Sequence, residues 1–202
     1  SLFGDALQYF NKAYALYKTP EVQDPDLFMH LLINLMETYS KSDDNKNFTK
    51  IRKESFEELL SLSKIKSERA SQVWEEIGDH HFRRENYDSA IFCYQEGLKA
   101  AVDGFGSQNP SINPSESDIG FNYFVHELLT KKASALKKKF LINGDGSLLG
   151  QSMHCLRLAE RLISLQRNAL DLENAKWAFL DEKFDLYENI LLTLHEGENF
   201  FQ

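Results

Sequence analysis

Apolar side chains recur every three or four positions along most of this chain. In segment 70–83 the apolar or small positions are Val73, Trp74, Ile77, Gly78, His81 and Phe82. Such spacing puts them on a single stripe of an amphipathic helix. The same periodicity returns in nearly every segment between breaks rich in Gly, Pro or Asn, so the pattern predicts a chain made of helices.

The breaks in this pattern divide the chain into about eight or nine expected helices. Only 4 prolines and 10 glycines occur in 202 residues, which favours helices over strands. Ser115 or Ser117 is expected to cap one long helix that reaches about residue 140. The other helices are expected over 2–17, 27–39, 47–62, 70–83, 88–101 and 147–166, with one or two closing helices over 170–195. The predicted fold class is therefore all-α.

One irregular segment interrupts the helical pattern, at 103–116. It contains two glycines, two prolines and several Ser and Asn residues, which indicate an inserted loop. Long irregular segments inside compact domains are usually functional or disordered. Its serines also make it a candidate segment for regulatory phosphorylation.

Segment 70–101 resembles one tetratricopeptide repeat (TPR), whose pattern is W-x2-L-G-x2-Y followed by A-x3-F. The matching positions are Trp74, Ile77, Gly78, His81, Ala90 and Tyr94. The resemblance implies a right-handed α-α superhelix in which Gly78 and Ala90 let two helices cross closely. It also implies one solenoid domain over 1–202, cut from a longer chain and covered at its end by helices over 170–195.

In this family the first helices of successive repeats line a concave groove that receives a peptide or a partner helix. The corresponding residues are Gln72, Glu75, Asp79, Phe82 and Arg83. Members that bind chaperone tails hold a carboxylate with Lys and Asn at two of these places, where this chain has Glu75 and Asp79 instead. We therefore expect a basic or mixed-charge ligand rather than a chaperone carboxylate. Reversal of both acids to Lys should change partner binding and leave stability unchanged.

The overall charge argues against nucleic acids and anionic membranes as partners. The net charge is -8, and no apolar run approaches the roughly 18 residues of a membrane span. One local basic cluster remains, and it is either a solvated helix face or a site for a polyanion such as RNA or an inositol phosphate. Its members are Lys131, Lys132, Lys137, Lys138 and Lys139.

No motif in the sequence points to catalysis, a cofactor or a metal. The pair His126-Glu127 lacks the second His of a zinc-protease helix, and the turn 143–146 lacks the carboxylates of a calcium loop. Cys93 and Cys155 lie among apolar residues and are expected to be core thiols.

These features together predict a cytoplasmic or nuclear scaffold or adaptor that binds other proteins during complex assembly, and that is not an enzyme. Two alternatives stay open. The first is a helical regulatory or accessory domain of a larger enzyme, and the second is polyanion binding through Lys131–Lys139.

Overall fold

The structure is a computed structural model that describes residues 2–19, 24–119, 122, 124–168, 187–193 and 195. Within these residues every regular element is a helix, and residues 187–193 are also helical. The all-α prediction is therefore confirmed. The helices are α1 (Leu2–Tyr17), α2 (Pro25–Lys41), α3 (Asn45–Ser61), α4 (Glu68–Arg83), α5 (Tyr87–Ala101), α6 (Glu116–Ile119), α7 (Val125–Asn143) and α8 (Gly146–Asn168).

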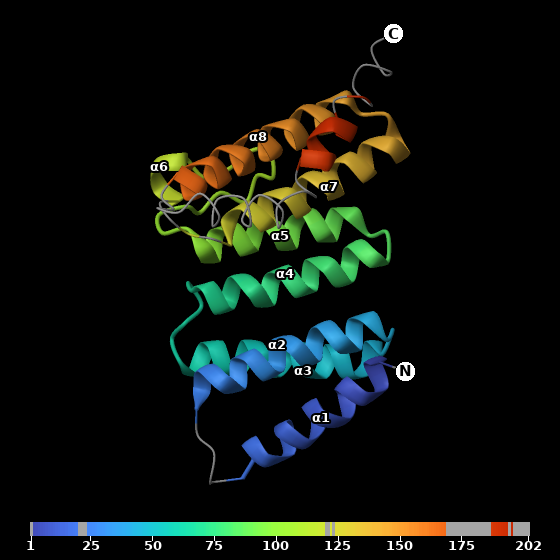
Figure 1. The fold of residues 1–202 in the computed structure, drawn as a ribbon, viewed down its shortest axis with the longest axis vertical. Helices are drawn as coiled ribbons and strands as arrows, with labels where there is room; N and C mark the ends of the chain where they lie inside the picture. Colours follow the sequence, from blue (N-terminus) through green and yellow to red (C-terminus); the bar gives the residue numbers. More distant parts are fainter. Residues whose placement is uncertain are drawn as a thin grey trace.

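The helices pair with their neighbours in sequence and the pairs stack in layers (Figure 1). Helix α2 packs on α3, α4 on α5, and α7 on α8, and short turns join the two helices of each pair. Contacts of α4 with α2 and α3, and of α5 with α7, connect one pair to the next, while α1 packs on α2. Each pair therefore covers apolar surface that its neighbour would otherwise expose.

Polar caps set the ends of the central pair, α4 and α5. The Ser67 hydroxyl accepts a hydrogen bond from the backbone N–H of Ala70 at 3.1 Å, which begins α4. The carboxamide oxygen of Asn86 accepts one from the N–H of Ser89 at 3.4 Å, which begins α5. The turn between them runs through Glu85, whose φ is 58°. These local signals are the reason why the boundaries lie within one or two residues of those expected.

Gly78 lies at a close helix contact, as expected, but its partner differs from the expected one. A Cβ atom at Gly78 would lie 2.5 Å from Cε1 of Tyr94. The expected partner, Ala90, lies one turn earlier on α5 and is fully buried. The aromatic ring of Tyr94 therefore fills the space that the missing side chain of Gly78 leaves.

The expected long helix up to about residue 140 is wrong, because the chain breaks between α6 and α7. Ser115 does cap the first part, since its hydroxyl accepts from the N–H of Asp118 at 3.3 Å. Asn122 then donates its side-chain N–H to the carbonyl of Ala101 at 3.0 Å and accepts from the N–H of Phe124 at 3.1 Å. This tertiary contact with the end of α5 stabilises the break. The irregular segment 103–116 before it is confirmed up to residue 115.

Two clusters of buried apolar residues form the core, and α5 contributes to both. One lies among α1 to α4 and includes Cys93 and Ala100 of α5, while the other joins α5 to α7 and α8. Most of the expected closing helices over 170–195 lie outside the described residues, but Ile190 packs against the second cluster. The single domain over 1–202 stays a prediction. No helix in the described part of the chain is long and apolar enough to cross a membrane.

Candidate functional site

The acids expected in the concave groove form ion pairs with a lysine of the expected polyanion patch. Lys131 of α7 forms an ion pair with Glu75 of α4 and a second, at 2.8 Å, with Asp79. Burial alone would lower the pKa of Lys131, but the charges of Glu75 and Asp79 outweigh it and raise the pKa. These acids therefore have a cationic partner within the stack.

The other residues expected in the groove turn toward different neighbours. The Gln72 side chain accepts a hydrogen bond from Arg69 at 3.0 Å. Phe82 packs against the core cluster of α5, α7 and α8, and its ring meets that of Tyr87 edge-on at 5.4 Å. Arg83 donates to the Ser40 hydroxyl of α2 at 2.7 Å. The structure thus brings Glu75 and Asp79 together and separates the remaining three.

The five clustered lysines do not share one face. Lys132 is 0% exposed and Lys137 is also buried, whereas Lys138 is exposed. Lys139 forms an ion pair with Asp88 at 2.5 Å, and Lys131 pairs with the two acids of α4. Helical geometry explains this, since adjacent residues point about 100° apart.

Lys132 belongs to a buried polar network that anchors the insertion. Its ammonium group donates to Oε1 of Gln95 at 2.6 Å and to Oδ1 of Asn113 at 2.8 Å. The Gln95 side-chain N–H group donates to the carbonyls of Ser107 and Ile112, at 2.8 and 3.1 Å. Burial lowers the pKa of Lys132. The insertion is therefore fastened to α5 and α7 through side chains rather than left as a free loop.

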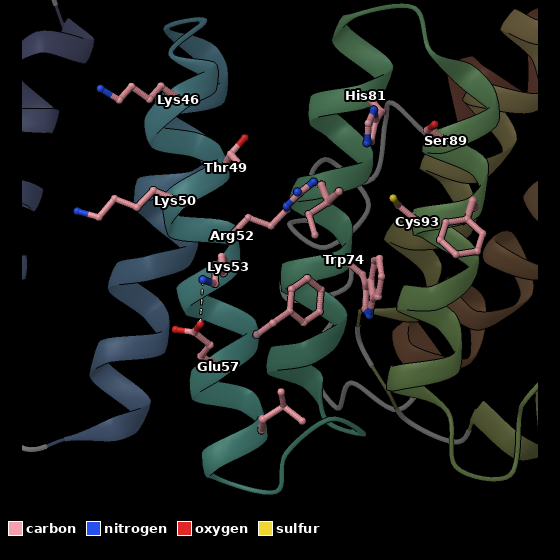
Figure 2. Close-up of a pocket in the computed structure, with 14 residues that line it drawn as sticks. Lys46, Thr49, Lys50, Arg52, Lys53, Glu57, Trp74, His81, Ser89 and Cys93 are labelled. Atoms are coloured by element: carbon pink, nitrogen blue, oxygen red, sulfur yellow. Dashed lines mark ion pairs between the residues drawn. The ribbon is translucent and has the colours of Figure 1, made fainter.

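A groove lies on another side of the stack, between α3, α4 and α5, and we call it the α3–α5 groove (Figure 2). Its volume is about 890 Å³, within the range of ligand sites in proteins. Aromatic rings line it: Trp74 lies 5.1 Å from Phe56 and 6.2 Å from Phe92, both edge-on. The remaining lining residues are Lys46, Thr49, Lys50, Arg52, Lys53, Glu57, Leu60, Ile77, His81, Ser89 and Cys93.

Among the basic residues at this groove, Arg52 reaches from α3 toward α4, whereas Lys46 and Lys50 point away from the other lining side chains (Figure 2). The ammonium group of Lys50 lies 5.6 Å from the ring centre of Tyr14 on α1. Lys53 forms a long, exposed ion pair with Glu57 at 3.7 Å. Arg52 is therefore the cation directed into the groove.

The positive charge of Arg52 acts on side chains of the facing helices, α4 and α5. Burial lowers the pKa of His81, and Arg52 adds to that lowering. Burial also raises the pKa of the Cys93 thiol to about 12, with Arg52 opposing the rise. Cys93 and Cys155 are free, buried thiols, so the expectation of core cysteines is confirmed.

Reasoning from the sequence missed this groove, although α3 carries a signal for it. The cations of α3 lie in its first half and Glu54, Glu57 and Glu58 in its second half. The helix macrodipole favours the opposite arrangement, most strongly in the first and last turns. Phe92, an aromatic residue on the polar side of α5, is the second signal, and it is 50% exposed.

The described residues contain no group of three or more His, Cys, Asp or Glu side chains placed to hold a metal ion. The α3–α5 groove offers an arginine, aromatic rings and a neutral thiol, and these groups suit the binding of a partner molecule. Comparisons of the chain with protein-family models, with curated proteins and with solved structures found no match.

Proposed function

We propose that this chain is a protein-protein interaction scaffold, a TPR-like right-handed superhelix that binds a segment of a partner protein without chemistry of its own. The stacked helix pairs support the proposal, because each extra pair extends a rigid surface along which a partner can lie. The two free thiols suit a reducing compartment such as the cytoplasm or nucleus.

The α3–α5 groove is the observation that carries the proposal. The groove gathers Trp and Arg, which dominate binding energy at many protein interfaces, with Phe, which is enriched there. Phe92 and Leu60 are 50% and 60% exposed there, so a partner would remove apolar surface from water.

The acidic face of α4 is the weaker candidate for a docking site. Glu75 and Asp79 already have Lys131 as a partner, and a basic ligand would have to displace that ammonium group. In contrast, a ligand in the α3–α5 groove would cover exposed aromatic surface without breaking an ion pair between helices.

A pair of matched variants tests the proposal. Phe92→Asp places a charge in the groove, and Ile142→Asp places the same charge at another exposed apolar position, at the end of α7 and 71% exposed. Each variant and the unchanged chain would be used to capture partners from cell lysate. The captured proteins would be cross-linked to the chain, and mass spectrometry would identify them and their cross-linked residues. We expect cross-links at α3 to α5 that Phe92→Asp removes and Ile142→Asp keeps. Partners that bind both variants equally would contradict the proposal.

A further inference from the structure

We propose that the α3–α5 groove receives an acidic amphipathic helix, whose apolar side chains lie on Phe56, Trp74 and Phe92 and whose carboxylate pairs with Arg52. This inference rests on the proposed function, and it adds the chemistry of the partner. It differs from the basic or mixed-charge ligand that the sequence leads one to expect for the face of α4.

Arg52 is the first observation. It is half-buried, and no residue that the structure describes forms a hydrogen bond or an ion pair with it. Glu57, the acidic residue that lines the groove, pairs with Lys53, and Glu96 of α5 pairs with Lys99 at 2.7 Å. A guanidinium group presents a planar fork of donors that matches a carboxylate with two parallel hydrogen bonds. The groove therefore has an unfilled anion-binding group.

The charge around the groove agrees in sign with this assignment. Four basic residues and one acidic residue line it, in a chain whose net charge is -8. Lys46 and Lys50 point away from the cavity, so they add to the field at the rim rather than to direct contacts. Such a local field speeds encounter with an acidic segment and repels a basic one.

The aromatic surface beside Arg52 is the second observation. Trp74 lies between Phe56 and Phe92, so the three rings form one continuous strip across α3, α4 and α5. Apolar side chains of a partner gain free energy by covering this strip, while an acid on the same segment reaches Arg52. The occupant must therefore combine apolar and acidic residues on neighbouring positions of one face.

The shape of the groove favours a helix as the occupant. At the groove α4 lies between α3 and α5, and the lining residues of α3 run from Lys46 to Leu60. At 1.5 Å per residue this lined part of α3 is roughly 21 Å long, which accommodates about four helical turns. An amphipathic helix lying in a groove presents anchors at positions i, i+3, i+4 and i+7, a spacing that suits a strip of rings.

A selection from a random peptide library displayed on phage tests the proposed chemistry without prior choice of a ligand. The full chain would be the bait, and enriched peptides would be synthesised and titrated by fluorescence anisotropy against each variant. We expect enriched peptides to carry Asp or Glu beside Leu, Phe or Trp at helical spacing. Arg52→Gln should lower the affinity of these peptides about tenfold or more, since it removes one partner of a charge pair.

Lys46→Gln is the matched control, because it removes the same charge from α3 while leaving Arg52 in place. This variant should lower the affinity of the acidic peptides no more than about twofold, since Lys46 points away from the cavity. Equal losses in Arg52→Gln and Lys46→Gln would overturn the role of Arg52.

The remaining outcomes separate the two proposals. Peptides that lose binding to Phe92→Asp but are neutral or basic would overturn the acidic partner and leave the docking groove intact. Peptides that bind Phe92→Asp as tightly as the unchanged chain, or a selection without enrichment, would overturn both. A second copy of the chain as the occupant would appear as a dimer in analytical ultracentrifugation that Arg52→Gln dissociates, and this too would overturn the proposal.

Discussion

Lys131 of α7 lies 2.8 Å from a carboxylate oxygen of Asp79 of α4, an ion pair between residues 52 positions apart in the sequence. The same ammonium group also pairs with Glu75. Asp79 in turn accepts a hydrogen bond from the hydroxyl of Tyr94 on α5, at 2.7 Å. One cation therefore connects the pair formed by α4 and α5 to the pair formed by α7 and α8.

Replacing Lys131 with Met should destabilise the protein. Glu75 and Asp79 would remain in a half-buried place without their counter-charge, and we expect a loss of about 1 to 3 kcal/mol in the free energy of unfolding. That value lies below the range for fully buried pairs because Lys131 is 33% exposed. Urea unfolding would measure it. Lys138→Met, at an exposed lysine of the same helix, should change stability by less than about 0.5 kcal/mol.

Joint reversal of Glu75 and Asp79 to Lys should lower stability as well, in contrast to the expectation from the sequence. Three ammonium groups would then meet where two ion pairs existed, and like charges at this distance repel. Thermal unfolding should show a lower midpoint than Lys131→Met alone. A midpoint equal to that of the unchanged chain would mean that these ion pairs contribute nothing.

Gly78→Ala should destabilise the pair of α4 and α5. The added methyl group would lie 2.5 Å from Cε1 of Tyr94, whose ring is 1% exposed and whose hydroxyl is bound to Asp79, so the ring has little freedom to move. Such overpacking costs about 1 to 3 kcal/mol, of which the helix propensity gained by replacing Gly offsets at most about 1 kcal/mol. Chemical denaturation would record the change.

Gly150→Ala is the control for this substitution. Gly150 also lies inside a helix, but a Cβ atom there would meet nothing within 4 Å. We expect this variant to gain about 0.5 to 1 kcal/mol from helix propensity alone. A lower free energy of unfolding for Gly78→Ala and a higher one for Gly150→Ala would establish the close contact at Gly78. A higher free energy of unfolding in both variants would refute it.

Gln95→Leu should release the insertion from the helices. The carbonyls of Ser107 and Ile112 would lose their donor, and Lys132 would lose one of its two acceptors. Each buried polar group left without a partner costs about 1 to 3 kcal/mol. We expect faster hydrogen exchange over residues 103–115 and earlier cleavage by chymotrypsin after Phe105. Lys99→Gln, which removes only a helical i,i+3 pair of α5, should leave exchange in this segment unchanged.

The stability of the protein should fall as pH rises through the range in which Glu76 ionises. Burial, and then the charge of Asp79, raises the pKa of Glu76 to about 8, and its Oε2 atom has no hydrogen-bond partner in the described structure. The folded state therefore holds a proton that the unfolded state has already lost, so rising pH favours unfolding between about 4.5 and about 8.

Glu76→Gln should abolish this dependence and make the protein more stable than the unchanged chain at alkaline pH. Comparison of unfolding free energies at about pH 7 and about pH 9 should show a decrease of about 1 kcal/mol that the variant lacks. This window avoids His80, whose pKa burial lowers to about 4 from 6.5. If the free energy of unfolding changes equally with pH in both proteins, Glu76 is already ionised in the folded state at about pH 7.

Local patterns of residues were sufficient to predict the helices and most of their ends. Periodic apolar positions and capping side chains such as Ser67 and Asn86 act within a few residues of the backbone, so their effect is readable along the chain. The same holds for the insertion, because glycines and prolines break a helix locally. The free, buried state of Cys93 also followed from its apolar neighbours in sequence.

Packing between helices that are distant in sequence sets which charges meet and which remain without a partner. Lys131 and Lys132 are adjacent in sequence, yet one pairs with acids of α4 and the other is buried against Gln95 and Asn113. The break after α6 and the α3–α5 groove likewise depend on contacts between distant helices. Such contacts are set by how the helix pairs stack, which depends on the packing of whole surfaces rather than on any local pattern of residues.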